Sequence, residues 1–229
     1  MPSKKSPKIN LSAFPRSIVT SKKNFKLPSI SSVKPRGIQK GGVIKLVVGL
    51  GNPEEKYNNT RHNAGREIVL VLVDDLGAES TINQVEKNYL VSQAKSLGLT
   101  IMAPQTYMND SGKAVSAFLK NSKIKPAQIL VIHDDIDLPL GKAKISFAKN
   151  SAGHKGVESI IKVLKTNEFW RLRIGISLGK KKIDALKIVL KKWQPEELKI
   201  FKKLVKKSVE TIKIAAMEGP EKAMSEFNS

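Results

Sequence analysis

The chain has 229 residues, which suffices for one sizeable hydrophobic core, and it has no cysteine, which excludes disulfides, thiolate catalysis and cysteine-ligated zinc. Its 41 lysines and arginines outnumber its 20 acids, giving a formal net charge of +21. This excess favours a polyanionic partner, with nucleic acid ahead of an anionic membrane surface, although a solvated lysine surface gives the same count. No apolar run approaches the ~20 residues that cross a bilayer, so we expect no membrane-spanning segment.

Residues 1–42 predict a disordered basic leader. They contain ten lysines and arginines, five prolines and no acid, so the remaining residues carry +11. The prolines break any long helix, and apolar periodicity is lacking. The composition fits an organelle transit peptide, a basic RNA-contacting tail, or an assigned start upstream of the true one. The folded domain is therefore expected at residues 43–229.

Predicted strands and helices alternate along this domain. In chain order they are a buried strand at 43–50, a helix at 64–76 that stops at Gly77, a hairpin at 88–104, a helix at 111–121 with Ser111 as N-cap, strands at 127–135 and 141–149, a helix at 155–166, a strand at 170–177, a long amphipathic helix at 194–217 opened by Pro195, and a short helix at 219–227. The alternation predicts one α/β domain with a twisted, mixed, mostly parallel β-sheet flanked by helices. In such sheets ligands bind at the carboxyl ends of the strands.

The glycine loop GLGNPE, at residues 49–54, follows the first predicted strand. It supplies two glycines of a dinucleotide-binding pattern, but Glu54 stands where the third glycine belongs. A carboxylate there would repel a pyrophosphate, so we interpret the loop as a tight strand-to-loop turn.

Three histidines, His62, His133 and His154, are the only ones in the chain, and each lies in a segment rich in Asn, Asp or Gly. For any one of them a structural role is the default. His62 is the best candidate for a general base acting on water, because a neutral imidazole takes up a proton near neutral pH when a carboxylate fixes its tautomer. Asp134, in the segment HDDID, is the best-placed carboxylate.

Alternative chemistries find less support in the same residues. Three histidines with several aspartates could ligate zinc, but the chain has no local histidine pair, so no metal site is predicted. The chain also lacks a G-x-S-x-G elbow, which favours direct attack by water over a serine nucleophile. Two asparagines in loops, Asn52 and Asn109, are either ordinary turn residues or amides that donate to an oxyanion and hold a peptide backbone.

Five motifs together resemble the bacterial-type peptidyl-tRNA hydrolases over about residues 43–228. They are VVGLGNPEEKYNNTRHNAG, TYMNDSGKAV, HDDIDLPLGKAKI, SAGHKGVESI and FWRLRIGI, in this order. The resemblance implies a single α/β domain that is monomeric, needs no metal or other cofactor, and cleaves the ester joining a peptide to the 3′ ribose of tRNA. It implies a cytoplasmic enzyme, or one in an organelle stroma or matrix if residues 1–42 are a transit peptide.

The same resemblance assigns roles to the reacting residues. His62 resembles the catalytic base, and Asp134 resembles the carboxylate that orients it. Asn52 and Asn109 resemble the amides that hold the peptide and its ester carbonyl.

Further residues match the binding surfaces of the family. Tyr57 and Met108 resemble walls of the peptide groove, and His154 resembles a residue at the rim of the channel for the tRNA 3′ end. Arg173 resembles one of two basic residues that bind the tRNA 5′-phosphate.

The sequence departs from the family pattern at two positions. Lys155 stands where a substrate-holding Asn is usual, and a lysine offers donors but no acceptor. Ser146 stands where the lysine that partners Arg173 is usual, so Lys144, two residues earlier on the strand, or Lys142 is expected to serve instead.

A second hypothesis keeps the fold but not the chemistry. A plant chloroplast group II intron splicing factor resembles the same family and acts through a protein partner. Such a protein has no need of Asn52, His62, Asn109 and Asp134 together, and all four are present here. The hydrolase is therefore the favoured prediction.

Overall fold

The computed structural model describes residues 42–84, 88–179 and 185–228, which all belong to the unit Gln39–Ser229. The leader expected at residues 1–42 lies outside the described residues, apart from Gly42. Within the described ranges, no helix is long and apolar enough to cross a membrane.

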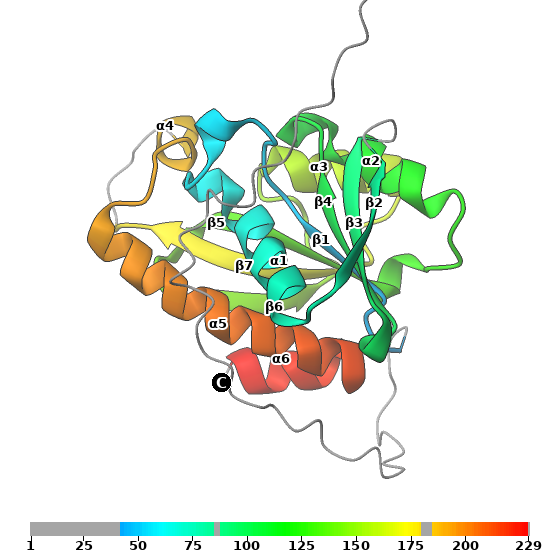
Figure 1. The fold of residues 1–229 in the computed structure, drawn as a ribbon. Helices are drawn as coiled ribbons and strands as arrows, with labels where there is room; N and C mark the ends of the chain where they lie inside the picture. The colour runs from blue at the N-terminus through cyan, green and yellow to red at the C-terminus, as the bar shows by residue number, and fades with distance from the viewer. Residues whose placement is uncertain (1–41, 85–87, 180–184, 229) are drawn as a thin grey trace, which may run out of the picture. The chain divides into compact units, whose positions relative to one another are not determined.

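Seven strands of the described residues form one mixed sheet in the order β2-β3-β4-β1-β5-β7-β6 (Figure 1). Their bounds are β1 (Leu46–Gly49), β2 (Glu79–Gln84), β3 (Tyr89–Ala94), β4 (Leu99–Pro104), β5 (Ile129–Pro139), β6 (Ala143–Phe147) and β7 (Trp170–Ser177). The four central strands, β4, β1, β5 and β7, pair in parallel, whereas β2, β3 and β6 pair antiparallel at the two edges. The predicted α/β fold with a mixed sheet is confirmed, and its parallel pairs lie at the centre.

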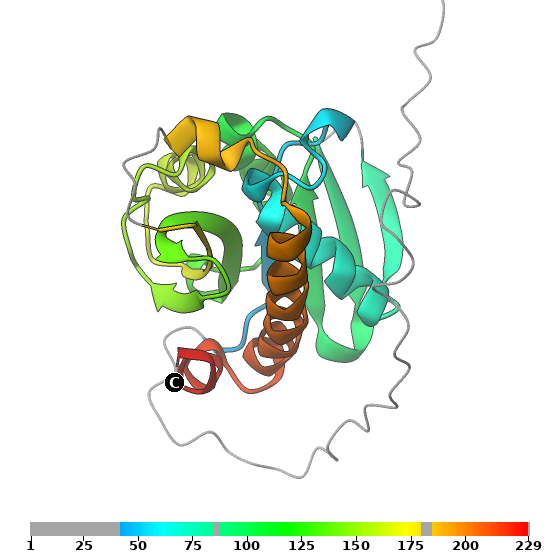
Figure 2. The same cartoon turned by 90° about the vertical axis from the view of Figure 1, so that its left-hand side faces the viewer.

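Helices cover both faces of this sheet. The longer ones are α1 (Ala64–Asp75), α2 (Ser111–Leu119), α3 (Lys155–Leu164), α5 (Pro195–Met217) and α6 (Pro220–Asn228), with a short α4 (Ala185–Val189). Side chains of α1, α5 and α6 share a core with Val47 of β1, while α2 and α3 pack with its neighbours Leu46 and Val48. Successive strand residues point to opposite faces, so β1 contributes to both layers. Figure 2 shows α1 and α5 side by side on one face.

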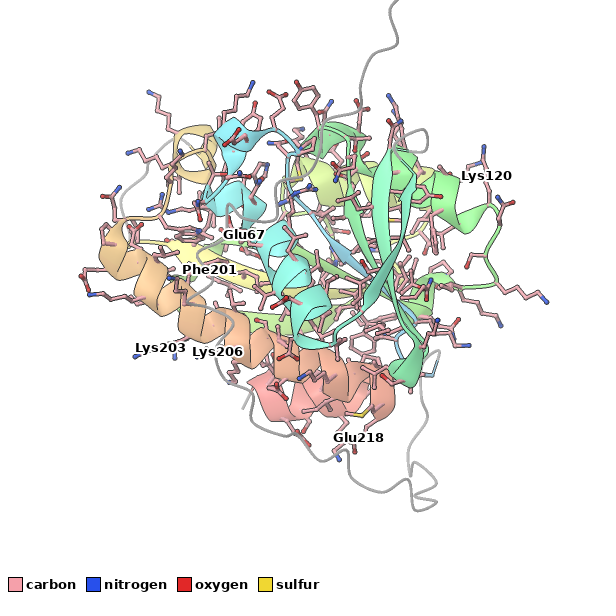
Figure 3. The ribbon with its side chains drawn as sticks, viewed as in Figure 1. Glu67, Lys120, Phe201, Lys203, Lys206 and Glu218 are labelled. Carbon is pink, nitrogen blue, oxygen red and sulfur yellow. The ribbon has the colours of Figure 1, made fainter. Side chains whose placement is uncertain are left out.

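Helix α5 is amphipathic, as predicted, and Pro195 occupies its first turn. Phe201 and Val205 are buried in the core, whereas Lys203 and Lys206 project away from the sheet (Figure 3). The apolar stripe holds the helix against α1, and the lysines stay in solvent.

The start of α1 approaches the sheet so closely that only glycine fits. A Cβ atom on Gly65 would lie 2.1 Å from the carbonyl oxygen of Ile132, and one on Gly49 would lie 2.4 Å from the carbonyl oxygen of Gly65. This contact sets the turn before α1 against the end of β1 and against Ile132 within β5. It is the turn that carries His62.

Two predicted boundaries are wrong. Ser111 is the first residue of α2 rather than its N-cap, because a 3₁₀ turn, Met108–Asp110, leads directly into the helix. The Ser111 hydroxyl donates to the carbonyl of Met108 (2.9 Å). Strand β5 was predicted to end at Asp135 but continues to Pro139, so His133, Asp134 and Asp135 lie in its middle and not at its end.

Two elements carry no clear sequence signal. Strand β2 has the sequence ESTINQ and lacks an alternating apolar pattern, and α4 spans only five residues. Both are held by their neighbours, β2 by antiparallel pairing with β3 and α4 by contact with the turn before α1.

Candidate active site

His62 and Asp134 form the centre of the site. His62 lies on a 3₁₀ turn, Arg61–Asn63, and its Nδ1 is 2.8 Å from Oδ1 of Asp134 on β5. The His62 side chain is 13% exposed and that of Asp134 is 3% exposed. Because the carboxylate accepts, Nδ1 carries the proton, and the lone pair of the neutral ring is on Nε2. This Nε2 atom has no partner among the described residues.

His154 makes a second contact with the same carboxylate oxygen. Its Nε2 lies 3.0 Å from Asp134 Oδ1, and its Nδ1 accepts from the backbone N–H of Val157 (3.3 Å). His154 is the N-cap of α3, so the first turn of that helix fixes the tautomer of its ring. Both imidazoles therefore donate to one buried oxygen.

His133, the third histidine, lies behind this pair. Its Nδ1 donates to the backbone carbonyl of Asp134 (2.7 Å), and its ring meets that of His154 at 4.7 Å between centroids. His133 is buried, and its ring packs edge-on against that of His154.

Burial and neighbouring charges shift the pKa values of Asp134, His62 and His133 in different directions. Burial raises the pKa of Asp134, but the facing His62 and His154 outweigh it and hold that pKa well below its usual range. Burial lowers the pKa of His62, but the Asp134 charge and hydrogen bond outweigh it and leave the pKa above its ordinary value. Burial and the neighbouring His154 keep the pKa of His133 well below its usual value, so this ring stays neutral.

These groups also form the candidate metal site of the described residues, since ligand atoms of His62, Asp134 and His154 lie within 4.8 Å of one another. However, both ring nitrogens are 2.8 and 3.0 Å from the same oxygen. Ligands of a tetrahedral zinc ion with bonds of about 2.0 Å are ~3.3 Å apart. The arrangement fits two hydrogen bonds better than an ion, which would have to break both.

Asn52 is held in one orientation. Its backbone N–H donates to Oδ1 of Asn63 (2.8 Å), and Nδ2 of Asn63 donates back to the carbonyl of Asn52 (3.0 Å). Its side-chain Oδ1 accepts from the backbone N–H of Met108 (2.8 Å). The side-chain NH₂ group is thus the remaining donor of Asn52. Asn63 was not among the predicted site residues, although it directly follows His62 in the motif TRHNAG.

The residues predicted for the peptide groove differ in exposure. Met108 is buried, and Asn109, beside it on the same turn, is exposed and has no hydrogen-bond partner among the described residues. Tyr57 is half-buried on the loop that follows Asn52. The hydroxyl of the exposed Tyr107 donates to Glu54, so the loops of Tyr57 and Met108 are joined at the surface.

Lys155 is the first residue of α3. Its side chain is 70% exposed, and its Nζ lies 3.1 Å from Oε2 of Glu158, one helical turn away. Such an exposed pair contributes little to stability. The ammonium group is thus turned toward Glu158 and not into the histidine cluster.

A basic row crosses the sheet beside the histidines. In the register of β5, β7 and β6, Arg173 stands between His133 and Lys144, so the three side chains share one face. Nε of Arg173 donates to Oδ2 of Asp135 (2.6 Å). Lys144 is exposed, and so is Lys142 just before β6.

Ser146 is buried opposite Arg171 on β7. Lys144 is therefore the direct cross-strand neighbour of Arg173. Asp135, which pairs with Arg173, was also not predicted as a site residue, since the second of two adjacent acids gives no sign of its partner.

Comparison with known proteins places the chain in a family. The family model described as peptidyl-tRNA hydrolase matches residues 46–229. Peptidyl-tRNA hydrolase of Sulfurihydrogenibium sp. (strain YO3AOP1) is 44% identical over 140 residues, covering 61% of this chain and 74% of that protein. The enzyme of Aquifex aeolicus (strain VF5) is 45% identical over 139 residues, covering 61% and 72%. A solved structure of peptidyl-tRNA hydrolase from Acinetobacter baumannii superposes with a TM-score of 0.76 at 31% identity, covering 81% of this chain and 95% of that one. This chain belongs to the peptidyl-tRNA hydrolase family.

Proposed function

We propose that this chain hydrolyses the ester bond between the peptide and the 3′ ribose of peptidyl-tRNA, releasing free peptide and free tRNA. The observation that carries the proposal is the 2.8 Å contact between His62 Nδ1 and Asp134 Oδ1, which leaves Nε2 of His62 to accept a proton. The family match over residues 46–229 supplies the substrate class.

The proton moves through His62. Nε2 takes a proton from water as the water oxygen attacks the ester carbonyl carbon, and the buried Asp134 stabilises the imidazolium that forms. When the tetrahedral intermediate collapses, the bond to the ribose oxygen breaks, and His62 returns the proton to that oxygen. A positioned base of this kind contributes ~10²–10⁴-fold.

Asn52 supplies a donor for the developing oxyanion. Its amide is oriented before substrate arrives, because the Met108 N–H occupies its oxygen and Asn63 fixes its backbone. An oriented donor needs no reorganisation during the reaction, and losing one costs ~2.7–4 kcal/mol in comparable sites. Asn109, with its free amide, grips the peptide backbone.

The remaining residues bind the two ends of the substrate. Tyr57 and Met108 line the peptide groove, and His154 and Lys155 lie where the tRNA 3′ end enters. Arg173 and Lys144 hold the 5′-phosphate, with Lys142 beside them. The charge of the chain favours a polyanion, which is what the leaving tRNA presents.

The proposal further takes the chain to act as a monomer without a metal or other cofactor. Its site of action is the cytoplasm, or an organelle stroma or matrix if residues 1–42 are a transit peptide.

The test is hydrolysis of an N-blocked aminoacyl-tRNA by the purified protein, with free aminoacyl-tRNA as the matched substrate. Cleavage of the blocked ester with survival of the free one supports the proposal. Binding of the blocked tRNA without cleavage would replace it with the RNA-binding, catalytically inactive alternative, which no feature of the described residues favours.

A further inference from the structure

Arg61 is a buried cation for which the proposed chemistry has no use. It precedes His62 directly and is 2% exposed. Burying a guanidinium is costly unless it is paired and hydrogen-bonded, so a fully buried arginine beside a catalytic base requires an explanation.

The guanidinium makes contacts that all lie in one segment, residues 191–197. Its Nη2 is 2.5 Å from Oε2 of Glu197, in the first turn of α5. Its Nη1 donates to the carbonyls of Lys191 (3.2 Å) and Lys192 (3.3 Å), and its Cζ lies 5.3 Å from the centroid of the Trp193 ring. Two guanidinium nitrogens, Nη1 and Nη2, thus hold a segment more than a hundred residues away.

The backbone of the turn is attached to the same segment. The N–H of Arg61 donates to the carbonyl of Lys191 (3.1 Å), and the N–H of Trp193 donates to the carbonyl of Asn59 (3.0 Å). Thr60 and Lys192 form an antiparallel bridge between them. Figure 1 shows α4 next to the turn that leads into α1.

Glu197 also completes the start of α5. Its Oε2 accepts from the backbone N–H of Gln194 (2.9 Å) as well as from Arg61. The carboxylate therefore joins the turn before α1 to the N-terminus of α5, where a negative charge also suits the helix dipole.

The position of His62 relative to Asp134 is set by contacts between separate elements. It lies on a single 3₁₀ turn, whose hydrogen bonds are weaker than those of an α-helix. Its partner Asp134 is on a different element, β5. A misplacement of about 1 Å between reacting groups costs ~10²-fold in rate, so whatever fixes the turn also fixes the reactivity of His62.

We propose that Arg61 is a positioning residue: through Glu197 and the 191–193 backbone it holds the turn of His62 at the distance at which its ring meets Asp134. The inference rests on the proposed hydrolase function. It makes the start of α5 a part of the catalytic apparatus without any contact to substrate.

The test compares Arg61→Met with a control at Lys213, a second buried cation, which lies on α5 and pairs with exposed acids. Its Nζ pairs with Asp75, the last residue of α1 (2.6 Å), and with Glu210 (2.9 Å). Lys213→Met removes a cation that joins α5 to α1. The Lys213–Asp75 pair lies near the C-terminal ends of both helices, and His62 lies before the N-terminal end of α1. Each variant is assayed for its single-turnover rate, its KM and its Tm, at a temperature below the lowest Tm.

We expect Arg61→Met to lower the single-turnover rate ~10–10²-fold while KM stays within about twofold. Arg61→Lys should recover part of that rate, because an ammonium group still pairs with Glu197 but lacks the fork that reaches both carbonyls. Lys213→Met should lower Tm and leave the rate at the wild-type level.

A folded Arg61→Met with the wild-type rate would overturn the inference, and so would an equal loss of rate in Lys213→Met. If Arg61→Met does not fold, the inference is tested with Glu197→Gln, because glutamine keeps the shape of the side chain and one acceptor oxygen. A lowered single-turnover rate at unchanged KM in this variant supports the inference. A wild-type rate refutes it. An inactive wild type would refute the proposed function instead.

Discussion

Replacing Asp134 by Asn isolates what its charge does for His62. The amide has nearly the same shape, but it carries no net charge and offers one acceptor atom where the carboxylate accepts from both His62 and His154 at Oδ1. The imidazolium formed during the reaction would then lack its counter-charge.

The size of the effect follows from the geometry. With a contact of 2.8 Å between Nδ1 and Oδ1, the charge centres of the two groups are ~4 Å apart, and such a pair interacts by about 4 kcal/mol at an effective dielectric constant of ~20. At about 1.4 kcal/mol per decade this corresponds to ~10³-fold in rate. The amide dipole retains a part, so we expect a decrease of ~10²–10³-fold in the single-turnover hydrolysis of N-blocked aminoacyl-tRNA.

The pH profile gives a second, independent readout of the same substitution. His62 acts as a base only when neutral, so the rate falls as pH drops through the pKa of His62, which Asp134 raises above its ordinary value. In Asp134→Asn the pKa of His62 falls, and the acid limb of the profile moves to lower pH while the plateau drops. A rate within about threefold of wild type, or a lower plateau with an unmoved acid limb, would refute the charge-based role of Asp134.

The other predictions concern binding, stability and the departure at Lys155. Lys144→Ala should raise KM for a substrate with a 5′-phosphate, leave kcat unchanged, and reduce the salt slope by about one; an equal effect on 5′-dephosphorylated tRNA would argue against the phosphate contact. Burial raises the pKa of Glu67 on α1 to about 8, so its contribution to stability is present below about pH 4.5 and is lost as pH rises through 8. Glu67→Gln should therefore gain stability over wild type in urea unfolding at pH 8 and not at pH 5, and equal gains at both would contradict this. Lys155→Asn should change the single-turnover rate by less than about threefold, since its ammonium group is exposed and paired with Glu158; a larger change would place position 155 at the reacting ester.

The sequence was sufficient to predict most of the fold. Apolar periodicity marked α1, α5 and the central strands, because burial against the sheet is what selects those residues. It failed for β2, whose ESTINQ sequence has no apolar stripe, and for the end of β5, which was placed at Asp135 although the strand continues to Pro139. Polar residues are accommodated inside that strand because each has a specific partner, which no local pattern shows.

The candidate site was predicted only in part, because local patterns do not show which polar residues pair in the folded chain. The family motifs singled out His62, Asp134 and Asn52, and the structure brings the first two into contact across 72 positions of the chain. The supporting contacts went unpredicted: Asn63 resembles any turn amide, and the partner of Arg61 lies 136 positions away. Long-range polar pairing depends on the tertiary fold. A single sequence therefore predicts the reacting residues more readily than the residues that position them.

The most direct test of the account is the single-turnover hydrolysis of N-blocked aminoacyl-tRNA by wild type and by His62→Ala, with tRNA binding measured alongside. The account predicts that the wild type cleaves the ester, and that the variant binds the tRNA with unchanged affinity but cleaves it at least ~10²-fold more slowly. A variant that cleaves as fast as wild type would contradict the assignment of His62 as the base.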